Sequence, residues 1–89
     1  RNADLLKEAA AGAESEIYSR EGSMTERLGA FLSALKEAAS IDPRLAGTVE
    51  SLESSMYQLE DAAAFLRDYA AAVESAPEAL EAAGARLDL

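Results

Sequence analysis

Apolar residues recur at helical spacing along most of the chain, and turn signals divide them into four segments. Alternating steps of three and four residues place side chains on one face of a helix. The pattern predicts helices over about residues 4–20, 24–40, 43–75 and 77–89. In the first two, the apolar rows are Leu6, Ala9, Ala13 and Ile17, then Met24, Leu28, Phe31, Leu35 and Ala38. Leu80, Ala83 and Leu87 form the row of the last one.

The third segment carries the clearest pattern. Its apolar residues follow a heptad spacing without a fault, the signature of a left-handed coiled-coil seam. These residues are Leu45, Val49, Leu52, Met56, Leu59, Ala63, Leu66, Ala70 and Val73. A second apolar strip runs beside the seam, formed by Tyr57, Ala64, Phe65, Ala71 and Ala72. A two-stranded coil would leave this strip exposed, so we expect a further helix to cover it.

Short connections separate the segments. Gly22 is a plausible helix stop, and Ser23 with Glu26 forms a capping box for the next helix. Asp42 followed by Pro43 is a strong restart signal. Such short connections predict antiparallel neighbours at both Gly22 and Asp42. The expected fold is therefore all-α: an antiparallel coiled coil, an elongated helical hairpin or a small bundle, in one segment spanning residues 1–89.

Charge and composition narrow the possible functions. The chain has no cysteine or histidine and a formal net charge of −9. Thiolate metal sites are excluded, and the commonest catalytic base is missing. No phosphate-binding loop or metal-ligand motif occurs, so we expect no enzyme, cofactor or metal site in this segment. The cations are scattered along the chain, which argues against direct DNA binding by this segment. No apolar run is long enough to cross a membrane, which makes the cytoplasm the default location.

Charged residues flank the seam at seven-residue spacing. Glu53, Glu60, Arg67 and Glu74 form one column, and Lys36 and Arg27 are candidate partners across an antiparallel pair. Tyr57, Phe65 and Tyr69 are a candidate docking patch for another protein, although aromatic residues on a helix more often seal a bundle. Plain solvation of the charges is an equally good interpretation of the column.

Four short stretches resemble landmarks of the RecN family, in the family's order. They are Asn2-Ala3-Asp4-Leu5, Ile41-Asp42-Pro43-Arg44-Leu45, Leu66-Arg67-Asp68-Tyr69, and Pro77-Glu78 with Leu80 and Arg86-Leu87. Members of this family are bacterial SMC-like ATPases of DNA double-strand-break repair. The resemblance implies that this chain is part of the coiled-coil arm, a spacer and interaction element without an ATPase head. ATP and Mg would bind in the parent's head, and DNA would be contacted by the intact, nucleoid-associated protein.

The partners implied by this resemblance are the rest of the parent chain (its head and the other arm helix) and a second copy. Two alternatives come from other classes of protein. One is a free-standing acidic helical bundle that acts as an adaptor or scaffold. The other is an acidic DNA mimic, which would space its carboxylates like phosphates, whereas much of the acid here flanks the seam. We expect none of these three kinds of protein to associate with a membrane.

Overall fold

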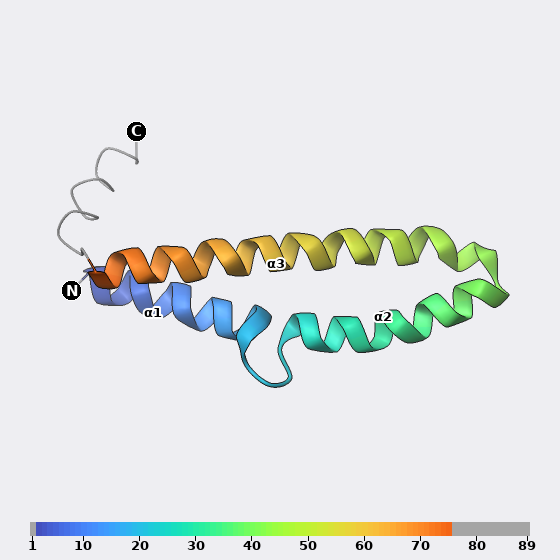
Figure 1. Ribbon diagram of the computed structural model, residues 1–89, viewed down its shortest axis with the longest axis horizontal. Coiled ribbons are helices and arrows are strands. Elements are labelled where there is room, and N and C mark those ends of the chain that lie inside the picture. The colour runs from blue at the N-terminus through green and yellow to red at the C-terminus, as the bar shows by residue number, and fades with distance from the viewer. Residues whose placement is uncertain (1, 76–89) are drawn as a thin grey trace.

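The computed structural model describes residues 2–75, which form an all-α hairpin (Figure 1). The outgoing arm contains α1 (Asn2–Glu14), a π-helical turn η1 (Ser15–Ser19) and α2 (Met24–Ile41). A short 3-10 turn η2 (Pro43–Leu45) leads into the returning helix α3 (Ala46–Ser75). The predicted all-α hairpin is confirmed. The predicted helix 77–89 lies outside the described residues.

Helix α3 is the long element that organises the hairpin. It is 30 residues long, which corresponds to about 45 Å at 1.5 Å per residue. Both α1 and α2 pack against α3, and neither contacts the other within the described part of the chain. The prediction of an antiparallel pair at Gly22 is therefore wrong. Pairing both short helices with the continuous apolar seam of α3 leaves no reason for the chain to reverse at Gly22; within residues 2–75 it reverses at Asp42, between α2 and α3 (Figure 1).

Capping residues define where α2 begins. Ser23 Oγ accepts a hydrogen bond from the backbone amide of Glu26 at 3.2 Å, as the capping box predicts. The Glu26 carboxylate accepts the amide of Gly22 at 2.5 Å rather than that of Ser23, whose amide donates to the Arg20 carbonyl instead. Gly22 adopts φ 76°, the left-handed conformation that glycine tolerates best. The turn before α2 is thus fixed by local chemistry.

The hairpin tip is held by Asp42. Its carboxylate accepts the backbone amide of Arg44 at 3.1 Å and forms an ion pair with the Arg44 guanidinium at 2.8 Å. Pro43 follows as the first residue of the turn, where a missing amide hydrogen has no cost. The predicted restart at this position is confirmed.

The Arg44 contacts lower the pKa of Asp42, through the side-chain hydrogen bond first and the backbone hydrogen bond second. A lowered folded-state pKa means that the ionised carboxylate stabilises the hairpin above the ordinary aspartate pKa of about 3.9. This contribution disappears as the pH falls through the lowered value. We expect Asp42→Asn, which keeps a capping oxygen but loses the charge, to melt below wild type at neutral pH. The difference in Tm should vanish in acid, and a difference that persists there would contradict the role of the charge.

The two apolar rows predicted for the outgoing arm are partly correct: Leu28 is buried and Ile17, Leu35 and Ala38 are part-buried, but the other members are exposed. In α1, Leu6, Ala9 and Ala13 are exposed, while Ala10 and Glu14 are buried. In α2, Met24 and Phe31 are exposed, while Thr25, Leu28 and Leu32 are buried. The face that contacts α3 is thus rotated by about one residue from the predicted row. In α1 the buried positions are the small Ala10 and the charged Glu14, which faces Arg67 of α3, while in α2 the small Thr25 is buried together with Leu28 and Leu32.

Candidate functional site

The candidate structural seam lies along the contact line of α3. The structure places all nine of its residues at buried or part-buried positions, with Val49, Ala63 and Val73 buried. Opposite them, Ala10, Leu28 and Leu32 are buried on the outgoing arm. These six residues constitute the buried apolar core among the described residues. Such a narrow core leaves most of each helix facing solvent.

Ion pairs cross between the arms on one side of this core. Lys7 pairs with Glu74 at 3.3 Å, Glu14 with Arg67 at 3.6 Å, and Lys36 with Glu53 at 2.7 Å. The predicted pairing of Lys36 with the charged column of α3 is thereby confirmed. Arg27, the other candidate cation, forms no ion pair within residues 2–75 and lies beside Met24 and Phe31 instead. We call the side of the hairpin that carries the three ion pairs the charged edge.

These pairs reveal a change of register. Along an uninterrupted antiparallel pair of helices, the sum of the two residue numbers is the same for every pair of facing residues. The total is 81 for both Lys7–Glu74 and Glu14–Arg67, but 89 for Lys36–Glu53. The outgoing arm therefore contains eight more residues than α3 requires. They are accommodated between α1 and α2, by the π-helical turn and the loop that ends at Ser23 (Figure 1).

Glu14 lies at the N-terminal end of this eight-residue insertion. Its side chain is 11% exposed, accepts a short hydrogen bond from Ser19 Oγ and faces the Arg67 guanidinium. The π-helical turn is closed by the Arg20 amide, which donates to the Ser15 carbonyl at 3.0 Å. π-Helical turns commonly mark one extra residue in a helix. The insertion therefore begins directly after Glu14, whose carboxylate is paired with Arg67 of α3.

Loss of the Arg67 charge should destabilise the hairpin more than loss of a more exposed partner. We expect Arg67→Met, which retains the apolar stem, to lower the free energy of unfolding by about 1 kcal/mol, because the nearly buried Glu14 side chain then loses its cationic partner and keeps only the Ser19 hydrogen bond. The matched variant Lys7→Met leaves Glu74, whose side chain is 66% exposed, and should cost only about 0.2–0.5 kcal/mol. Urea denaturation followed by circular dichroism measures both. Equal losses would show that the burial of Glu14 has no consequence.

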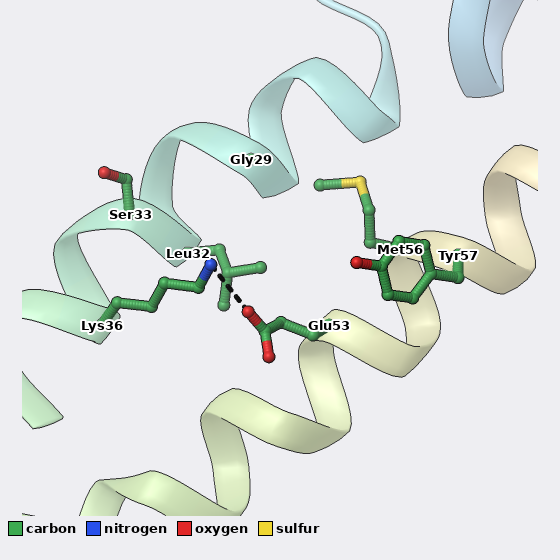
Figure 2. Close-up of a pocket in the computed structure, with 7 residues that line it drawn as sticks. All are labelled: Gly29, Leu32, Ser33, Lys36, Glu53, Met56 and Tyr57. Atoms are coloured by element: carbon green, nitrogen blue, oxygen red, sulfur yellow. Dashed lines mark ion pairs between the residues drawn. The ribbon is translucent and has the colours of Figure 1, made fainter.

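A shallow hollow opens on the charged edge between α2 and α3 (Figure 2). It has a volume of about 250 Å³, and Gly29, Leu32, Ser33 and Lys36 line it from α2, with Glu53, Met56 and Tyr57 from α3. It exists where Gly29 has no side chain: a Cβ there would be in van der Waals contact with the Met56 terminal methyl at 3.4 Å. The Lys36–Glu53 ion pair crosses one side of it (Figure 2).

The polar and charged side chains that line this hollow are Ser33, Lys36, Glu53 and Tyr57. The hydrogen bond to Glu53 and the charge of Glu53 raise the pKa of Lys36, so its amine is protonated at neutral pH. A protonated amine is neither a general base nor a nucleophile. The hydroxyl groups of Ser33 and Tyr57 have no imidazole to activate them in a chain without histidine. The hollow offers an ion pair and apolar contacts.

The predicted aromatic patch is divided by the structure. Phe65 and Tyr69 stack with ring centroids 6.0 Å apart, and Phe65 is 65% exposed. Tyr57 instead lines the hollow beside Met56, about 12 Å along the helix from Phe65 by its helical rise. The predicted second strip is not covered by another helix within residues 2–75, where Ala71 and Tyr57 remain exposed.

The sequence interpretation missed a second hollow, on the side opposite the ion pairs. It has a volume of about 270 Å³ and is lined by Met24, Arg27, Leu28, Phe31 and Leu59. Met24, Phe31 and Leu59 belong to predicted apolar rows, but periodicity alone does not indicate that they meet at an open surface. For α1, by contrast, a signal was available, because the spacing of Lys7 and Glu14 matches that of Glu74 and Arg67 in antiparallel order and so indicates the contact line.

Within residues 2–75, no three carboxylates come together in an arrangement that could hold a metal ion. None of the helices described is both long and apolar enough to cross a membrane. Comparison with known proteins gives no relative: no family model matches the sequence, and neither a curated protein nor a solved structure matches it.

Proposed function

We propose that this chain is a helical arm that acts as a spacer and contact element of a RecN-like, SMC-related ATPase in the repair of DNA double-strand breaks. The observation that supports this proposal best is the position of the two arms at their base. Lys7 in α1 pairs with Glu74 near the end of α3, while the turn at Asp42 lies at the far end (Figure 1). An arm inserted into a larger chain must leave and return at one base.

The continuous helix α3 supports the role of spacer. It contains no proline, and its single glycine, Gly47, lies in its first turn. A helix without these residues in its interior has no local cause for a sharp kink. Ion pairs at 2.7–3.6 Å tie it to the outgoing arm at three levels. The proposed role is mechanical, and ATP and Mg would be bound by the head of the resembled family, none of whose nucleotide-binding residues match this chain.

The acidic surface supports an indirect role in DNA binding. A chain of net charge −9 repels the phosphate backbone. DNA would therefore be held by other parts of the intact protein, and the arm would keep its own surface away from it.

Sequencing the encoding gene in both directions from this segment tests the proposal. The expected result is a Gly-x-x-x-x-Gly-Lys-Ser/Thr loop upstream and an ABC-type acidic strand downstream, in one reading frame with the arm. A reading frame without these motifs would overturn the ATPase assignment. The exposed Tyr57 and the Phe65–Tyr69 stack would then favour the second candidate, an acidic helical adaptor or scaffold that binds proteins through these aromatic side chains.

A further inference from the structure

Two aromatic side chains of α3 have carboxylates at the same two positions around them, four residues before the ring and three residues after it. The two groups are Glu53, Tyr57 and Glu60 and, eight residues further on, Asp61, Phe65 and Asp68. Residues three and four apart on a helix are neighbours on its surface, with Cβ atoms about 5–6 Å apart. Each ring is therefore flanked by two carboxylates. Both components attract a cation, the ring through its quadrupole and the carboxylates through their charge.

The first of these groups already holds a cation of the chain itself. The Lys36 amine pairs with the Glu53 carboxylate at 2.7 Å, and Lys36 and Tyr57 line the same hollow (Figure 2). Helix α2 can supply this amine because Glu53 lies on the charged edge, within reach of the outgoing arm. This pair is the chain's own example of a cation that lies beside an aromatic ring and a carboxylate.

The second group faces away from the outgoing arm. Phe65 follows Ala63, a residue of the buried core, by two positions, which is a rotation of about 200° around the helix. The Phe65 ring is accordingly 65% exposed, and Asp61 and Asp68 are exposed as well. Neither carboxylate forms an ion pair in the part of the chain that the structure describes. Arg67, the one cation of α3, pairs with the outgoing arm instead.

Tyr69 extends this surface. Its ring stacks on Phe65 with ring centroids 6.0 Å apart and an interplanar angle of 28°. We call the surface formed by Asp61, Phe65, Asp68 and Tyr69 the aromatic–acidic face. An apolar partner would bury its two carboxylates without compensation, which is costly, and a second copy of this chain would bring a net charge of −9 against it. Charge complementarity therefore favours a basic partner.

We propose that the aromatic–acidic face binds an arginine side chain that a basic segment of a partner protein presents. A guanidinium is planar, so it can stack on the Phe65 ring while its N–H groups remain free to donate to a carboxylate. Asp61 and Asp68 lie about one helical turn to either side of Phe65, so either carboxylate can accept. A lysine ammonium is a compact, strongly hydrated charge and cannot stack in this way. This inference goes beyond the proposed arm function and does not depend on it.

Amide chemical shifts of the 89-residue chain, measured during titration with short blocked peptides, test the proposal. The three peptides have the sequence Gly-X-Gly-X-Gly, where X is arginine, lysine or the uncharged isostere citrulline. We expect the arginine peptide to shift residues 61–69 most and to bind about threefold more tightly than the lysine peptide. The citrulline peptide should not bind. Shifts spread evenly over the acidic positions of the hairpin, equal affinities for arginine and lysine, binding of the citrulline peptide, or no shift at millimolar arginine peptide would overturn the proposal.

Matched aromatic variants locate the contact with the ring. Phe65→Ala should weaken binding of the arginine peptide about threefold to fivefold and abolish its advantage over the lysine peptide. Phe31→Ala removes another ring, 51% exposed, which has Arg27 and Ala34 at the two neighbouring positions instead of carboxylates. This second variant should leave the affinity unchanged. Equal losses in the two variants would contradict the assignment of the ring.

Matched charge variants locate the carboxylates. Asp61→Asn combined with Asp68→Asn should weaken binding of the arginine peptide about fivefold. Glu8→Gln combined with Glu37→Gln also removes two charges, from exposed positions without an aromatic neighbour, and should change the affinity less than about twofold through the net charge. Unchanged ellipticity at 222 nm verifies that each variant folds. If both double variants weaken binding equally, the peptide responds to net charge alone and the proposal is wrong.

Discussion

Leu59→Pro should unfold most of α3 and with it the hairpin. Proline in a helix interior removes one backbone hydrogen bond and clashes with the preceding turn, at a cost of about 3 kcal/mol or more. Leu59 also lies in the seam near the middle of the 30-residue helix, so its packing is lost as well. We expect a large loss of ellipticity at 222 nm and of the cooperative thermal transition. Gln58→Ala, at the adjacent exposed position, is the matched control and should leave both unchanged.

The same variant tests the proposed mechanical role in the intact protein. If the arm connects to an ATPase head, Leu59→Pro should abolish double-strand-break repair in cells, while isolated heads still bind ATP. Survival after DNA breakage and nucleotide binding are the two measurements. Normal repair by a variant whose arm is shown to be unfolded would contradict the mechanical role.

Deletion of residues 16–23 should stabilise the hairpin. It removes the eight surplus residues and brings the outgoing arm into one register with α3. After the deletion, Lys7, Glu14, Gly29 and Lys36 follow one another at seven-residue steps, as do Ala3, Ala10, Thr25 and Leu32. A single helix would replace the π-helical turn and the loop. We expect the free energy of unfolding to rise by about 1–2 kcal/mol, because fewer loop residues must be ordered in folding.

A shorter deletion, of residues 19–23, is the matched control for the register. It also removes loop, but it rotates α2 away from the contact line set by α1, so it should destabilise the hairpin. Thermal unfolding by circular dichroism distinguishes the two variants. If both deletions have the same effect, loop length alone matters and the inferred register is wrong.

Much of this fold could be predicted because its signals are local. The heptads of α3, the Ser23 cap and the Asp42-Pro43 turn depend on neighbours within a few residues, and each appears where the sequence indicates. The all-α hairpin follows from them. The charge pair of Lys36 and Glu53 could also be anticipated, since it needs only an antiparallel neighbour.

The incorrect predictions concern positions at which either of two neighbouring faces of one helix could contact α3. Leu6 and Phe31 are the largest apolar residues of their rows, so a hydrophobic pattern assigns them to the contact line. Glu14 and Thr25 occupy that line instead, because Glu14 meets Arg67 across the pair and Thr25 lies beside the buried Ser23. Periodicity identifies an apolar face but not what covers it. The direction of α2 after Gly22 was likewise undetermined, because the turn signal is the same whether the chain reverses or continues.

The surplus residues of the outgoing arm give the two arms different mechanical properties. Helix α3 alone sets the distance between base and tip, since it spans that distance without interruption. The outgoing arm reaches the same tip with spare contour length stored between Ser15 and Ser23. A pull on the outgoing arm would therefore extend this segment before it displaced the tip, whereas a pull on α3 would reach the tip directly. Force would pass along the returning helix and be absorbed in the outgoing one.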